Sequence, residues 1–164
     1  MSKPQKFQMQ AIQPNPSIER TCHGGLGQPS PAAHVKRQAP RKNPVSIAAA
    51  QATKFYEQVV AEGRLFTFTQ NDEYLIYPIE GKEVVPFWSS KTRLESIQAG
   101  HPKYQKYQIS EVSLERFLKE DLQLLEGERL SVGVNWSGAR LTGYDISAQD
   151  LRKNIEYWQS KGAA

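Results

Sequence analysis

The pattern of hydrophobic and polar residues takes on the periods of helices and strands from Ser46 onward. Ser46 suits the start of a helix because its hydroxyl can accept a hydrogen bond from the first turn. Gly63 suits its end, since glycine readily adopts the backbone that closes a helix. Between them, apolar residues recur at helical spacing at Ala52, Phe55, Tyr56, Val59 and Val60. We therefore predict a helix that runs from Ser46 to Glu62.

Three strands are predicted after this helix. Residues 65–69 are of β-favouring types, and the turn residues Asn71 and Asp72 separate them from a partner strand at residues 74–77. A turn at residues 80–82 then leads to a third strand at residues 84–88. Pro86 within it cannot donate a backbone hydrogen bond. We expect this strand to lie at an edge, or its Pro86 nitrogen to point away from the neighbour.

Three more helices and three more strands follow. We expect helices from about Ser89 or Ser90 to Ala99, from Ser113 past Leu125, and from Ser147 to about Ser160. Strands are expected at residues 107–110, 130–136 and 141–146. Because short links between successive strands require antiparallel pairing, the order predicts an α+β fold. It consists of an antiparallel sheet of about five to six strands covered by about four helices.

The last two strands form the clearest hairpin, because both alternate with a period of two around a turn at Ser137 and Gly138. Strict alternation places Val132, Val134 and Trp136 on one face of the sheet. We expect Trp136 to be buried, since large aromatic side chains dominate cores.

Charge and proline content separate residues 1–45 from the rest of the chain. This segment has seven basic residues against Glu19 alone, seven of the ten prolines, and Phe7 as its one aromatic residue. Such a composition removes backbone donors and offers little apolar surface to offset the entropy of ordering. We interpret residues 1–45 as a disordered basic tail and residues 46–161 as a single α+β domain.

Several short segments of the domain together resemble a small bacterial family. They are, in chain order, the helix with Phe55-Tyr56, the segment Val85-Pro86-Phe87-Trp88-Ser89, the helix with Phe117-Leu118, the strand Val132-Gly133-Val134-Asn135-Trp136, and the last helix with Leu151. In this order they resemble the domain of unknown function 2750 family over residues 46–160. The resemblance implies a compact bacterial α+β domain and supplies no catalytic residues.

The sequence contains no motif that assembles a catalytic, metal or cofactor site. Cys22, His23 and His34 are metal-ligand types, but they lie in the proline-rich tail without a fourth ligand. The glycine-rich run at residues 24–27 follows no strand, and His101 in a loop has no partner fixed by spacing. We therefore expect no catalytic residue, cofactor or metal, and an enzyme of unknown class is the least favoured alternative.

Two groups of residues are candidates for binding a partner. Lys103, Tyr104, Lys106 and Tyr107 form an aromatic and basic cluster in a loop, and Asn135 lies beside a turn. These five residues would form the surface of a protein-binding or regulatory module, of which an immunity-type inhibitor is one form. The alternative is RNA or ribosome binding through the tail, whose densest cations are Lys36, Arg37, Arg41 and Lys42.

The cellular location follows from two absences in the sequence. No window approaches the length of apolar chain that a membrane-spanning helix needs, so we expect no membrane contact. The first residues are not followed by the apolar run of a secretory signal. We therefore expect a cytoplasmic protein.

Overall fold

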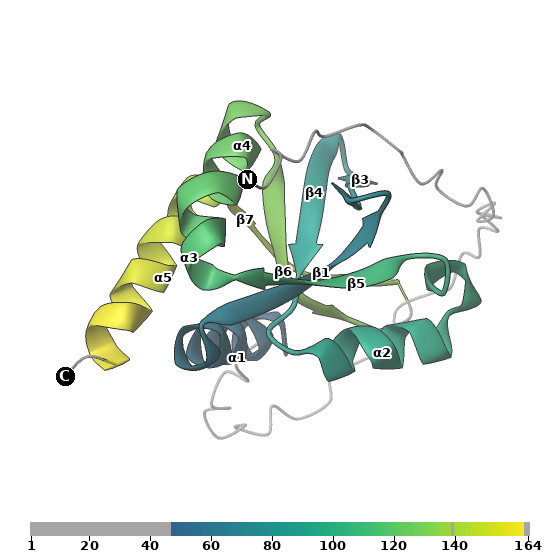
Figure 1. Ribbon diagram of the computed structural model, residues 1–164, viewed down its shortest axis with the longest axis horizontal. Helices are drawn as coiled ribbons and strands as arrows, with labels where there is room; N and C mark the ends of the chain where they lie inside the picture. Colours follow the sequence, from purple (N-terminus) through teal and green to yellow (C-terminus); the bar gives the residue numbers. More distant parts are fainter. Residues whose placement is uncertain (1–46, 139, 163–164) are drawn as a thin grey trace, which may run out of the picture.

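A computed structural model describes residues 47–138 and 140–162, so the proposed tail lies outside the described part (Figure 1). The helical elements are α1 (Ile47–Glu62), α2 (Lys91–Gly100), the 3-10 turn η1 (Pro102–Tyr104), α3 (Leu114–Arg116), the π-helical η2 (Phe117–Asp121), α4 (Leu122–Gly127) and α5 (Ala148–Gly162). The strands are β1 (Arg64–Gln70), β2 (Glu73–Tyr74), β3 (Tyr77–Ile79), β4 (Lys82–Phe87), β5 (Gln108–Ser113), β6 (Ser131–Ser137) and β7 (Thr142–Ser147). The predicted α+β class is confirmed, and the four predicted helices correspond to α1, α2, the continuous segment α3–η2–α4, and α5.

The strands form two sheets that meet at one pair of residues. One sheet has the order β2-β1-β5 and the other the order β3-β4-β6-β7. Phe66 of β1 and Trp88, just after β4, exchange two backbone hydrogen bonds of 2.8 Å each. This pair joins β1 to the end of β4, and the two sheets meet at an angle near the middle of the domain (Figure 1).

One strand pair departs from the predicted antiparallel sheet. β4 and β6 are parallel, with Val84–Phe87 opposite Ser131–Val134. Short links require antiparallel pairing only between strands that follow one another in sequence, whereas α2, β5 and α3–α4 lie between β4 and β6. That connection leaves ample chain for a parallel crossover. The described domain accordingly has seven strands in two sheets rather than five to six in one.

β4 is an interior strand, so the edge position that we considered for it is wrong. β3 and β6 flank it, but β3 pairs only as far as Val84, and Pro86 lies beyond that pairing. The carbonyl oxygen of Pro86 accepts a hydrogen bond of 2.8 Å from Thr67 Oγ1. Pro86 is therefore tolerated where the ladder on the β3 side has ended.

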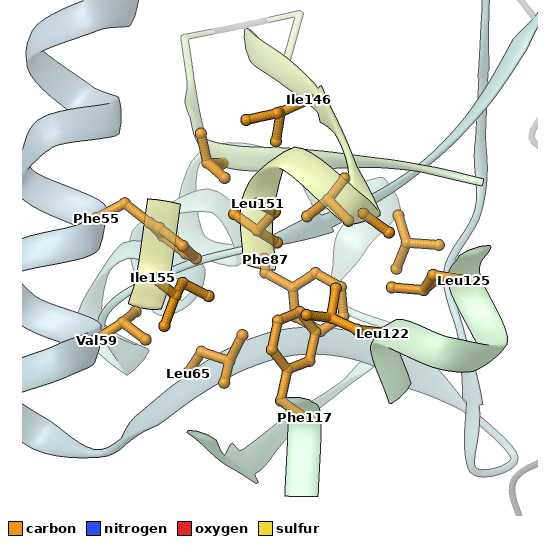
Figure 2. Packing of buried hydrophobic residues seen from close by; sticks show 14 of the residues in the cluster. Phe55, Val59, Leu65, Phe87, Phe117, Leu122, Leu125, Ile146, Leu151 and Ile155 are labelled. Atoms are coloured by element: carbon orange, nitrogen blue, oxygen red, sulfur yellow. The ribbon is translucent and has the colours of Figure 1, made fainter. Parts of the chain in front are cut away.

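Hydrophobic clusters cover both faces of the β4–β6 region. Successive strand residues point to opposite faces, and Val85 belongs to one cluster while Val84 belongs to the other. The first cluster packs between the strands and the helices α1, α3–α4 and α5, where Phe87 and Phe117 meet at a ring-centroid distance of 4.8 Å (Figure 2). The second cluster includes Leu94 from α2. Helices therefore close the strands from both sides.

A bulge in β6 reverses the face on which Trp136 lies. Asn135 has a positive φ of 46°, and the pairing of β6 with β7 shifts register between Val134 and Ser137. The extra residue turns Trp136 to the face opposite Val134, where it joins the second cluster. The predicted burial of Trp136 is correct at 1% exposure, but its predicted place beside Val132 and Val134 is wrong.

Candidate functional site

The candidate site lies beyond the carboxyl ends of the parallel strands β4 and β6. Ser89 follows β4 closely, and Asn135 follows the last β6 residue that pairs with β4. The carboxyl ends of neighbouring parallel strands form a crevice in which proteins of open parallel sheets bind ligands. The helix α2 also begins here, at Lys91.

A chain of hydrogen bonds connects this crevice to α1 and α2. The Ser89 amide donates to Asn135 Oδ1 at 2.9 Å, and the Ser89 hydroxyl donates to Gln58 Oε1 at 2.6 Å. Asn135 Nδ2 donates to the backbone oxygen of Gln51 at 3.1 Å. Arg93 Nη1 in turn donates to Gln51 Oε1 at 2.8 Å. Ser89 and Asn135 are buried, so the network fixes α1 and the start of α2 against the end of the sheet.

Two adjoining pockets open around this network. The larger, about 440 Å³, is lined by Arg93, Ser96, Ile97, His101, Trp136, Ser137 and Gly138. We call it the Arg93 pocket. The smaller, about 280 Å³, is lined by Ile47, Ala48, Gln51, Asn135, Ser137, Thr142 and Gly143. Ser137 lines both, and the Arg93–Gln51 hydrogen bond joins residues of the two.

Arg93 differs from the other half-buried arginines in the group to which it donates a hydrogen bond. Three arginines in the described part of the chain are half-buried. Arg116 lies 3.8 Å from the carboxylate of Asp121, and Arg152 lies 3.7 Å from that of Glu126. Arg93 has no carboxylate partner among the described residues, and it donates its hydrogen bond to a neutral amide. Burial lowers the pKa of the guanidinium, but an arginine retains its charge in proteins.

The stretch of sequence that contains Arg93 also has an excess of basic residues, unlike the rest of the domain. Residues 90–107, which we call the basic segment, contain four basic residues and one acidic residue. The rest of residues 46–164 contains ten basic and fifteen acidic residues. The basic segment supplies four of the residues that line the Arg93 pocket. A negatively charged group is therefore favoured near this pocket.

The predicted partner-binding residues are divided between surface and core. Lys103 and Lys106 are exposed, each with its ammonium 4.9 Å from the centre of a tyrosine ring. Those rings belong to Tyr104 and Tyr107, which are only 1% and 6% exposed. Tyr104 stacks on Phe68 in the second cluster at 5.7 Å. The two tyrosines are therefore core residues that support the lysines, and their rings do not offer an exposed aromatic surface to a partner.

Asn135 has a different role from the one that we expected. Its side chain is 1% exposed and bonded at both ends, so it holds the site together rather than facing a partner. Lys36, Arg37, Arg41 and Lys42 lie outside the described residues, as do Cys22, His23 and His34. Within the described residues, no group of three or more His, Cys, Asp or Glu side chains could hold a metal ion.

A buried acid forms a second polar cluster. Asp121, at the end of the π-helical η2, is 1% exposed and lies against Arg116 and Tyr74. Burial raises the pKa of the Asp121 carboxyl and that of the Tyr74 hydroxyl. Asp121 lines neither of the two pockets at the strand ends. We therefore interpret this cluster as a structural one between α3–α4 and the β2 strand.

A third feature is an apolar groove between α1 and the end of α5. It has a volume of about 570 Å³, and Val60, Ala61 and Trp158 are among its lining residues. Tyr157 beside it is 55% exposed. The ammonium of Lys161 lies over the rings of both Tyr157 and Trp158. Glu57 and Lys161 also line this groove, so it offers charges of both signs.

The fold and the site together define an α+β domain with a basic pocket at the carboxyl ends of two parallel strands. A family model described as "Protein of unknown function (DUF2750)" matches residues 52–155. The chain belongs to this family, which confirms the resemblance drawn from the sequence. No curated protein matches the chain. No helix in the described part has both the length and the apolar character needed to cross a bilayer.

Proposed function

We propose that this domain is a non-catalytic protein-binding module that holds an acidic partner at the Arg93 pocket. In this proposal it acts in the bacterial cytoplasm as a regulator, of which an immunity-type inhibitor is one form. The observation that carries the proposal is a half-buried arginine in a pocket, without a carboxylate partner among the described residues. A half-buried cation of this kind gains most from a charged hydrogen-bond partner, which a second protein can supply.

The distribution of charge supports a local contact with an acidic group. Exposed Lys103 and Lys106 extend the positive charge of the basic segment beyond the pocket. Complementary charge at an interface selects the partner and speeds association. An acidic segment of a protein can place its charges on this short stretch and keep them away from the acidic remainder of the domain.

The same distribution disfavours nucleic acid as the ligand of the described domain. A nucleic acid carries negative charge along its whole length, and the rest of residues 46–164 has fifteen acidic residues against ten basic ones. Binding of single strands also uses exposed aromatic rings as stacking platforms. Tyr104 and Tyr107 are buried, so they do not provide one.

The test is affinity capture with the full-length protein, the Arg93→Gln variant and a charge-matched control, Arg64→Gln. Arg64 lies on β1 and forms exposed ion pairs with Glu62 and Glu111, so its loss should change stability little. We expect one protein to be recovered with the wild type and with Arg64→Gln, and lost with Arg93→Gln. Capture should weaken as salt is raised.

Three outcomes would contradict the proposal. Equal recovery of the partner with Arg93→Gln would show that the pocket does not bind it. Recovery of RNA in place of a protein, abolished by removal of residues 1–45, would assign function to the tail. Absence of any specific protein would exclude a stable protein complex under those conditions and revive the enzyme alternative.

A further inference from the structure

We infer that the group held in the Arg93 pocket is a single carboxylate, the side chain of a glutamate or aspartate of the partner. This inference rests on the proposed function and names the chemistry of the same site. The alternatives are a phosphate group and a neutral polar group. The arrangement of Arg93, the charge of the pocket and its apolar wall each favour the carboxylate.

The guanidinium of Arg93 is held in place before any ligand binds. Its Nη1 donates to Gln51 Oε1 at 2.8 Å. The Gln51 backbone oxygen accepts from Asn135 Nδ2, and Asn135 Oδ1 accepts from the buried Ser89 amide. Side chains that are ordered beforehand lose less conformational entropy on binding. This network therefore prepares Arg93 for a partner of defined geometry.

The hydrogen bond to Gln51 occupies only part of the guanidinium. Nε and Nη2 of Arg93 have no hydrogen-bond partner among the described residues. Two neighbouring N–H groups of a guanidinium match the two oxygens of a carboxylate, and such paired bonds are stronger than single neutral ones. A neutral amide could accept only through one oxygen, so it would use this edge less well.

The charge of the pocket matches one negative charge. Arg93 is the single arginine or lysine among the described residues that line it. A phosphate group carries more negative charge than a carboxylate and offers three acceptor oxygens. Moving the larger charge out of water requires more compensation than one guanidinium supplies. A carboxylate is therefore the better matched anion.

The remaining lining suits the aliphatic part of an acidic side chain. Ile97 and Trp136 contribute apolar atoms to the pocket beside Arg93. Ser96 Oγ already donates to the backbone oxygen of Thr92 at 2.8 Å, so its hydroxyl hydrogen is not available to the ligand. The methylene groups of a glutamate could pack on Ile97 while its oxygens meet Arg93.

The experiment measures binding of three probes to the full-length protein by NMR titration or calorimetry. The probes are a blocked peptide with one glutamate, the same peptide with glutamine, and inorganic phosphate. The proteins are wild type, Arg93→Gln, Arg93→Lys and the control Arg64→Gln. Thermal unfolding of each variant shows whether it is folded.

We expect the glutamate peptide to bind wild type and Arg64→Gln alike, and Arg93→Gln about tenfold or more weakly, since a charge-assisted hydrogen bond is lost. Arg93→Lys should fall between them, because it keeps the charge but not the planar pair of donors. The glutamine peptide should bind wild type about tenfold or more weakly than the glutamate peptide.

Two results would overturn the inference. Tighter binding of phosphate than of the glutamate peptide would assign the pocket to a different anion. Equal binding of the glutamate peptide by wild type and Arg93→Gln would show that Arg93 does not bind the carboxylate. Neither result decides the proposed function, which the affinity capture with full-length protein tests separately. Absence of a captured protein, together with Arg93-dependent peptide binding, would refute only the proposed function.

Discussion

Replacing Gly133 with alanine tests whether the Trp136 indole lies flat across β6. A Cβ atom at residue 133 would lie 2.6 Å from Cζ2 of Trp136, and closer still to Cε2 and Nε1 of the same ring. Non-bonded carbon atoms prefer separations of about 3.5–4.0 Å, so the ring would have to move by about 1 Å or more. Gly133 does not have a positive φ, so backbone strain does not contribute.

The indole has little freedom to move away. Its Nε1 donates to Asp145 Oδ1 at 2.8 Å, and Tyr77 packs against it edge-to-face with ring centroids 5.4 Å apart. A Cβ atom at Gly143 would also lie only 2.6 Å from Cδ1 of the same ring. Overpacking of a well-packed core costs about 1–3 kcal/mol. We expect the cost of Gly133→Ala to reach the upper end of this range, because moving the indole would also strain its hydrogen bond to Asp145.

The assay is urea unfolding of Gly133→Ala beside a control, Gly100→Ala, with the free energy of unfolding obtained by linear extrapolation. Gly100 is the last residue of α2, and nothing lies within 4 Å of the position that a Cβ atom would take there. The control should stay within about 0.5 kcal/mol of wild type. If Gly133→Ala were as stable as this control, the placement of Trp136 over Gly133, and with it the bulge at Asn135, would be refuted.

Three further predictions use the same unfolding measurement. Asn135→Ala should lower the free energy of unfolding by about 2 kcal/mol because the buried Ser89 amide loses its acceptor. Asn135→Gly should be about 1 kcal/mol more stable than Asn135→Ala, because glycine adopts the positive φ of this position at lower cost. Ser147→Ala should cost about 1 kcal/mol, because Ser147 Oγ accepts from the Asp150 amide at the start of α5. Burial raises the pKa of Asp121, so its contribution to stability is greatest below the ordinary carboxyl pKa of about 4 and falls as pH rises through the raised value. Asp121→Asn should remove that decline, and an unchanged pH profile would contradict it.

The helices and hairpins could be predicted because their signals are local. Ser147 and Asp150 form the predicted cap of the last helix, with the hydroxyl accepting from the amide at 3.1 Å. The parallel pairing of β4 with β6 could not be predicted in this way. Nothing in the composition of two strands more than forty residues apart specifies their relative direction, which depends on how the intervening helices pack.

The site was only partly predictable for a related reason. Lys103 and Lys106 are exposed, but the alternation pattern does not show that a turn brings Tyr104 and Tyr107 into the core. Arg93 was missed because a single arginine in a helix is an ordinary surface residue in most proteins. The signal available in the sequence was the excess of basic residues over residues 90–107 in an otherwise acidic domain.

One residue connects the fold to the proposed site. Asn135 adopts the left-handed backbone that turns Trp136 toward the Arg93 pocket, and its amide reaches both Ser89 and the backbone of Gln51. A regular β6 would place residue 136 on the opposite face and remove one wall of the pocket. A positive φ costs a residue with a side chain about 1 kcal/mol, which the hydrogen bonds of the amide offset. The bulge therefore supplies one wall of the pocket, the Trp136 side chain.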